Sequence, residues 1–419
     1  MKQKKKLAFV LMCVCSVVLI LTGNPLFAGE VPGVTKDKII IGTISPLTGK
    51  IAMVGVPIAN AIKDYFSYIN EQGGINGRRV DVICEDGKYD PPQAIASLKK
   101  LIDRDKIFAC ASTSGTPITS ALSPTISREK LPSMAPIPSY GIFGLKSPKY
   151  LFSYGPYYAE QVAFNIEHIL FTLRAKNPRI AFFYQDDEFG KDGYRGFKAA
   201  VEKYNLNVVA TEKYTRGAID ISSQVLNMKR ANPDFLIITA IPSHSIMLLK
   251  EAKRQGLRVP IFSCANARLE VVIKVAGDAS ENYYCAEYIA LPNETHIPGM
   301  AKLIEIRNKR NPKSKVPPKY HILSYVNALI LGEGLKRAGK DLNREKLRDA
   351  LESIKDFDTK GLTGPISFSP RDHCPLTAMG CFEYEAAKIV NPNIEIKHTK
   401  LMTDGDPYCE VLFIEKGSD

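Results

Sequence analysis

The loop SPLTGKIAMVG, residues 45–55, has a glycine and a lysine between a strand-like run and a helix-like run, as phosphate-binding loops do. Such a loop also needs a glycine at a fixed distance before Gly49 and a hydroxyl-bearing residue after Lys50, to cradle phosphate and hold magnesium. Ile44 and Ile51 occupy those two positions. The sequence therefore disfavours nucleotide binding. What remains is a loop at the carboxyl end of a predicted strand, where open α/β sheets bind ligands.

Catalytic and metal-binding motifs are missing from the chain. Neither GxSxG nor HExxH occurs, and the six histidines are scattered. His244 stands at the start of a predicted helix, where a capping or solvated histidine is commoner than a general base. The nine cysteines show no CxxC or CxxH spacing, which argues against a zinc site. We therefore predict a protein that is not an enzyme and holds no metal or cofactor.

The N-terminal residues have the pattern of an export signal. A lysine-rich start precedes the apolar run 7–21, and Ala28 offers a small residue before a cleavage point. We predict a signal peptide at 1–28 and a periplasmic protein. An uncleaved membrane anchor is the alternative, because Leu26 is a poor residue near the cut. The net charge of +12 is scattered along the chain, so binding of nucleic acid is not expected.

Short apolar runs alternate with amphipathic, helix-like runs. The strand-like runs span 38–44, 79–85, 107–112, 179–184, 234–240 and 260–264. Their nearly continuous apolar character suits strands buried on both faces. Strands that alternate with helices predict parallel sheets covered by helices, an α/β fold. In the first helical run after residue 50, Pro57 suits the first turn.

Two lobes are more natural than one sheet of ten or more strands, which would be unusually wide. The strand–helix alternation restarts after the aromatic segment 150–161, and long helices such as 320–338 follow a second aromatic segment at 283–294. We predict that the chain crosses between lobes near residues 155, 289 and 362. These crossings define the two predicted lobes, 36–155 plus 290–362 and 156–289 plus 363–419.

An ordered set of motifs carries a family resemblance, and its stretches are 40–86, 90–102, 112–124, 131–141, 184–197 and 249–257. The chain resembles the periplasmic substrate-binding proteins of branched-chain-amino-acid-type ABC transporters, the Leu/Ile/Val-binding protein family with the type I periplasmic binding fold. The resemblance implies two Rossmann-like lobes with parallel-sheet cores and a hinged cleft. It also implies a monomer that captures a small organic acid or amino acid and delivers it to an ABC permease and its ATPase. The alternative is a ligand-sensing domain of the same fold that reports to a signalling partner.

Matching the family's cleft loops to this sequence gives the polar end of a ligand site. The loop STSGT contributes Ser114, Gly115 and Thr116, and the loop PIPSY contributes Pro138 and Ser139. Hydroxyl groups and backbone N–H groups are suitable partners for a carboxylate. Pro138 departs from the pattern, because it has no N–H to donate. The other interpretation of STSGT is a helix N-cap.

The remaining predicted contacts are apolar and concern the class of ligand. Phe189 keeps an aromatic ring of the family pattern without its hydroxyl group, and Ile241 stands where amino-acid binders have tyrosine. Ala265 stands where the family has the acidic residue that holds the α-ammonium, and Val54 adds to the apolar wall. We therefore predict an aromatic or aliphatic organic acid. A branched-chain amino acid, with Glu270 or another acidic residue as ammonium partner, is the alternative.

Export to an oxidising compartment makes disulfides plausible. Cys84 and Cys110 lie near the ends of two predicted strands that we expect to be neighbours, so we predict that they are bridged. Other pairings, including Cys264 with Cys285 and Cys374 with Cys381, stay open, and Cys409 is left over.

Overall fold

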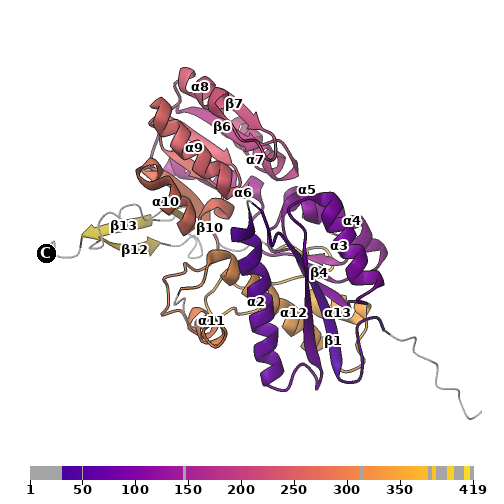
Figure 1. Ribbon diagram of the computed structural model, residues 1–419. Helices are drawn as coiled ribbons and strands as arrows, with labels where there is room; N and C mark the ends of the chain where they lie inside the picture. Colours follow the sequence, from indigo (N-terminus) through magenta and orange to yellow (C-terminus); the bar gives the residue numbers. More distant parts are fainter. Residues whose placement is uncertain are drawn as a thin grey trace, which may run out of the picture.

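The chain folds into two α/β lobes, which Figure 1 shows one above the other. The computed structural model describes residues 31–49, 51–144, 148–311, 316–375, 380–383, 394–400 and 410–415. The predicted signal peptide, Lys50 and Cys409 lie outside these residues. No helix in the described part is both long and apolar enough to cross a membrane.

The sheet of the first lobe consists of five parallel strands in the order β2-β1-β3-β4-β5. Its central strands are almost fully buried, which explains their continuous apolar sequence. The strands are β1 (Lys38–Ser45), β2 (Arg79–Asp86), β3 (Ala109–Thr113), β4 (Ser133–Met134) and β5 (Leu151–Phe152).

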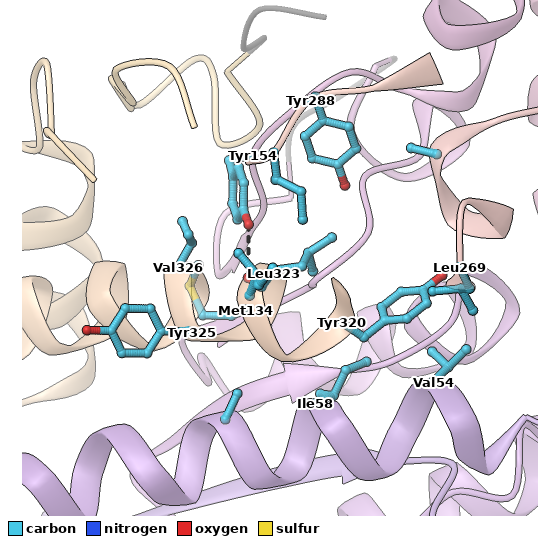
Figure 2. Packing of buried hydrophobic residues seen from close by; sticks show 14 of the residues in the cluster. Val54, Ile58, Met134, Tyr154, Leu269, Tyr288, Tyr320, Leu323, Tyr325 and Val326 are labelled. Atoms are coloured by element: carbon cyan, nitrogen blue, oxygen red, sulfur yellow. Dashed lines mark hydrogen bonds between the residues drawn. The ribbon is translucent and has the colours of Figure 1, made fainter. Parts of the chain in front are cut away.

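Helices from two distant parts of the chain cover this sheet. Early helices are α2 (Ala52–Glu71), α3 (Pro91–Asp103), α4 (Thr116–Arg128) and α5 (Tyr140–Phe143), and late ones are α11 (Pro298–Asn308), α12 (Lys319–Ala338) and α13 (Arg344–Glu352). Figure 2 shows α12 packed along α2. The rings of Tyr65 and Tyr325 meet edge to face with centroids 5.7 Å apart. The segment after residue 298 therefore returns to the first lobe.

The helix α2 begins earlier than the sequence suggested. It starts at Ala52, so Pro57 lies inside the helix and not in its first turn. Burial accounts for the extension, because Val54 and Gly55 are covered by neighbouring residues and Gly55 approaches Pro46 closely. The N-terminal end of α2 consequently lies at the cleft end of the lobe.

The sheet of the second lobe has five parallel strands and one antiparallel edge strand, in the order β11-β10-β9-β8-β6-β7. These are β6 (Arg179–Gln185), β7 (Asn207–Tyr214), β8 (Phe235–Thr239), β9 (Ile261–Ser263), β10 (Tyr283–Glu287) and the antiparallel β11 (Gly380–Glu383). A separate hairpin pairs β12 (Ile394–Lys400) with β13 (Glu410–Glu415). The predicted fold, two α/β lobes with parallel-sheet cores, is confirmed.

Helices cover both faces of the sheet in the second lobe. In one of them, α7, individual residues set both ends of the helix. Asp187 caps its N-terminus by accepting hydrogen bonds from the N–H groups of Phe189 and Gly190, at 3.1 and 3.2 Å. Asn205 ends it in the left-handed conformation. The helices are α6 (Tyr158–Glu167), a π-helical turn (His168–Thr172), α7 (Glu188–Tyr204), α8 (Ser222–Arg230), α9 (Pro242–Gln255), the 3₁₀ turn η2 (Ala265–Ala267), α10 (Glu270–Ala276) and the 3₁₀ turn η3 (Gly277–Ser280).

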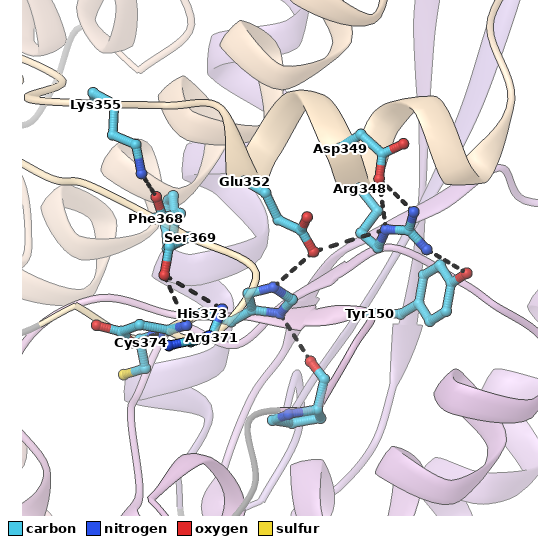
Figure 3. A network of polar contacts seen from close by, with 12 residues as sticks. Tyr150, Arg348, Asp349, Glu352, Lys355, Phe368, Ser369, Arg371, His373 and Cys374 are labelled. Atoms are coloured by element: carbon cyan, nitrogen blue, oxygen red, sulfur yellow. Dashed lines mark hydrogen bonds and ion pairs between the residues drawn. The ribbon is translucent and has the colours of Figure 1, made fainter.

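The segments near the three predicted crossings lie in contact with one another. The ring centroids of Tyr154 and Tyr288 are 6.3 Å apart, and Ala290 donates its N–H to Leu362 O at 2.8 Å. Figure 3 shows how the segment around residue 373 is held, with His373 Nε2 lying 3.0 Å from Glu352 Oε1 of α13. The exact division of the chain into lobes stays a prediction.

The predicted disulfide between Cys84 and Cys110 is wrong, because both residues are free thiols. The strand β1 lies between β2 and β3, with Thr43 opposite Cys84 and Gly42 opposite Cys110. Since neighbouring strands are about 4.8 Å apart, the Cα atoms of the two cysteines are separated by about 9–10 Å. A disulfide spans at most about 7 Å between Cα atoms.

Gly196 marks the close approach of α7 to α6. A Cβ atom at this position would lie 2.0 Å from the backbone oxygen of Ala159 on α6. Because a helix backbone cannot move aside as a flexible side chain can, we expect G196A to lower the free energy of unfolding by about 1–3 kcal/mol or more. Urea unfolding measures this change.

The exposed Gly141 provides the matched control, because a Cβ there would meet only Ser139 Oγ, at 3.8 Å. We expect G141A to change the free energy of unfolding by less than about 0.5 kcal/mol. Equal stability of the two variants would contradict the close packing of α6 on α7.

Candidate ligand-binding site

A cavity lies between the two lobes. Its walls come from loops and helix starts that follow strands of both sheets, together with the first turn of α12. We call it the outer cavity. Its lining residues are Ile51, Val54, Tyr89, Ser114, Gly115, Thr116, Ile137, Tyr158, Phe189, Ile241, Pro242, Asn266 and Tyr320.

Six of the nine predicted contact residues line this outer cavity. They are Val54, Ser114, Gly115, Thr116, Phe189 and Ile241. Pro138, Ser139 and Ala265 do not line it, whereas their neighbours Ile137 and Asn266 do. Ser139 is instead buried at the start of α5. The structure therefore brings most of the predicted residues together, and their contact with a ligand stays a prediction.

The polar end of the outer cavity is the tight turn between β3 and α4. Gly115 has a φ of +107°, which a side chain rarely permits, and a Cβ there would lie 2.7 Å from the ring of Tyr89. Thr116 opens α4, and its Oγ1 is buried without a hydrogen-bond partner among the described residues. An unsatisfied buried hydroxyl at a helix start is suited to an anionic or polar ligand group.

Asn266 is a second polar residue at the cavity, and the sequence prediction missed it by one position. Its Nδ2 donates to Ala240 O at 2.9 Å, while its Oδ1 is buried without a partner in the described part of the chain. The 3₁₀ turn after β9 sets which residue of the loop reaches the cavity. Loop register of this kind leaves no periodic signal in the sequence.

Three tyrosines that the sequence prediction missed give the cavity an aromatic wall. They are Tyr89, Tyr158 and Tyr320. The rings of Tyr158 and Phe189 meet edge to face with centroids 4.6 Å apart. Burial raises the pKa of each of these phenols, so that they stay protonated and able to donate a hydrogen bond. The only local signal for Tyr89 is its position shortly after a predicted strand.

None of the described residues that line the outer cavity carries a charge. The nearby carboxylate of Asp187 accepts the backbone N–H groups at the start of α7, and burial raises its pKa. Glu270, the alternative ammonium partner, is exposed and does not line the cavity. The described part of the outer cavity is therefore neutral.

A smaller cavity adjoins the first and shares four of its lining residues. We call it the inner cavity. Figure 2 shows Tyr288, Tyr320 and Leu323, three of its lining residues, around the start of α12. The lining residues are Ile137, Tyr158, Gln161, Ala265, Asn266, Tyr288, Lys319, Tyr320 and Leu323.

Comparison with known proteins agrees with this architecture. The pattern of the family described as periplasmic binding protein matches residues 38–388. The chain belongs to this family. The predicted family resemblance is thereby confirmed, and the matched region contains both cavities.

Curated relatives and solved structures of this family cover most of the chain. The leucine-, isoleucine-, valine-, threonine-, and alanine-binding protein of Pseudomonas aeruginosa is 22% identical over 346 residues, covering 80% of this chain and 87% of its own. A fatty acid ABC transporter substrate-binding protein from Thermomonospora curvata has a TM-score of 0.74 and 25% identity, covering 87% of this chain and 97% of that one. A branched chain amino acid ABC transporter protein from Thermus thermophilus with bound valine has a TM-score of 0.74 and 20% identity. The match covers 85% of this chain and 100% of that one. These names describe binding and transport, which supports a non-enzymatic role at the level of the family.

Thr116 and Thr119 are both buried in α4, but among the described residues only the hydroxyl group of Thr119 has hydrogen-bond partners. Its Oγ1 donates to Thr113 O at 2.6 Å. Removing a bonded hydroxyl leaves its partner unsatisfied, so we expect T119V to lower the free energy of unfolding by about 1–3 kcal/mol. We expect T116V, measured without ligand by urea unfolding, to stay within about 0.5 kcal/mol of the wild type. Equal losses would show that Thr116 has a partner within the protein.

Proposed function

We propose that this chain is the exported receptor of an ABC-type importer and that it captures a small carboxylic acid with an apolar body. It is released by cleavage of the signal peptide 1–28 and acts as a monomer. Its two lobes, 36–155 plus 290–362 and 156–289 plus 363–419, close around the ligand and deliver it to the permease and its ATPase. Hinge closure of this type is the usual motion of periplasmic binding proteins.

The observation that carries the ligand class is the lack of a carboxylate among the described residues that line either cavity. An α-ammonium enclosed in a closed cleft without a carboxylate partner would cost several kcal/mol. Asn266 Oδ1 is suited to a hydroxyl or amide donor of the ligand, but a neutral amide does not balance a full positive charge. An amino acid is therefore disfavoured.

The rest of the outer cavity supports an acid with an apolar body. Thr116 offers a buried hydroxyl at a helix N-terminus, which is suited to a carboxylate. Val54, Phe189 and Ile241 provide an apolar wall for the remainder of the molecule. The Thermomonospora curvata protein is named for fatty acid, and the name of the Pseudomonas aeruginosa protein includes the branched-chain amino acids. Both kinds of ligand combine one carboxylate with an apolar body.

A matched pair of ligands tests this proposal by isothermal titration calorimetry. Leucine and 4-methylpentanoate have the same carbon skeleton and differ in the α-ammonium group. We expect 4-methylpentanoate, or an aromatic acid such as phenylacetate, to bind at least about tenfold more tightly than leucine, because the ammonium would lose its hydration without gaining a charged partner. Thermal denaturation supplies a second readout, since a ligand at about 100 times its Kd adds about 2.7 kcal/mol of stability. Micromolar binding of leucine or valine without a response to organic acids would refute the proposal.

A further inference from the structure

Lys319 places a cationic side chain at the inner cavity, and the described residues that line the outer cavity include none. It is the one cationic side chain among the described residues that line the two cavities. Its side chain is 3% exposed. Lys319 is the first residue of α12, a 20-residue helix whose N-terminus adds positive potential to the position. A buried cation at this end of a helix is costly unless anionic groups compensate it.

The partners of Lys319 leave part of its hydrogen-bonding capacity open. An ammonium group has three N–H donors, and within the described residues two acceptors contact this one, Ala265 O and Glu287 Oε2. Glu287 Oε2 lies 2.6 Å from Lys319 Nζ and also 3.4 Å from Arg268 Nη1. Lys319 therefore shares its carboxylate with another cation and retains one donor for a ligand group.

Hydroxyl groups of the inner cavity add to this donor set. Tyr158 and Tyr288 line the cavity, and burial raises the pKa of both phenols, which keeps their protons in place. Two other polar residues of the wall are used within the protein, whereas Asn266 Oδ1 has no partner among the described residues. Gln161 Nε2 donates to Pro156 O at 3.0 Å, and Tyr320 Oη donates to Asn266 O at 2.8 Å. One ammonium and two phenols are a suitable set of partners for a carboxylate.

We infer that the inner cavity binds a second carboxylate and that the ligand is a dicarboxylic acid with an apolar middle. One carboxylate lies at Thr116 in the outer cavity and the other at Lys319, with the apolar wall between them. The inference rests on the proposed function, because it assumes that the outer cavity holds an organic acid. It differs from that proposal in requiring two anionic ends.

Calorimetry with two ligand series tests the inference. The first series contains linear monocarboxylates of four to ten carbons, and the second contains the dicarboxylates of the same lengths. We expect the best dicarboxylate to bind wild-type protein at least about tenfold more tightly than the monocarboxylate of equal length, since a charge-assisted hydrogen bond is worth about this factor or more. We expect K319M to remove this difference by weakening the dicarboxylate alone.

Two further variants keep the test decisive. K319M removes one of the two cations that neutralise Glu287, and it can therefore lower stability. Y288F is a milder change, because it removes only one hydrogen-bond donor from the inner cavity. We expect Y288F also to weaken the binding of the dicarboxylates alone. T116V is the control at the other end, and we expect it to weaken both ligand series by similar factors.

The outcomes separate the two proposals. If monocarboxylates bind and dicarboxylates bind no better, the inference is overturned while the proposed function stands. Equal losses of both series in K319M would also overturn it, because Lys319 would then hold a single carboxylate. If neither series binds and leucine does, both proposals fail.

Discussion

The cleft depends on one constraint, the parallel direction of the core strands in both sheets. A parallel connection carries the chain back across the sheet, so the loops that follow the strands emerge at the same edge. In this protein the loops after β1, β2, β3 and β4 meet those after β6, β8 and β9. Residues that are far apart in the sequence consequently line one cavity, and each lobe supplies part of the wall.

The helix α12 connects the two lobes at the back of this cleft. Its body packs on α2 of the first lobe, while its first residues contact the second lobe through the Lys319–Glu287 ion pair and the hydrogen bond from Tyr320 to Asn266 O. Opening the cleft by moving the second lobe away from α12 would break these contacts. Separating a buried ion pair costs several kcal/mol unless water or a ligand replaces the lost partner. The same residues that shape the inner cavity therefore resist opening.

Much of the outer cavity could be predicted because its residues lie close to the ends of strands with clear apolar runs. Phe189 follows β6 and Ile241 follows β8, and both line the cavity. The strand β7 was missed because it lies at the sheet edge and has exposed and half-buried positions in place of a continuous apolar run. Ala265 was predicted where Asn266 lines the outer cavity, since the turn geometry after β9 is not encoded in hydrophobic periodicity.

The sequence by itself determined the class of fold and the edge of each sheet at which the cavity lies, because strands buried on both faces require uninterrupted apolar runs and crossover helices require amphipathic ones. Only the tertiary structure decided which distant segments meet. It inserted β1 between the strands of Cys84 and Cys110, and it brought Lys319 and Tyr320 of a returning helix to the cleft. Strand order and helix return are set by packing between whole elements, and such packing leaves no local pattern in the residues concerned.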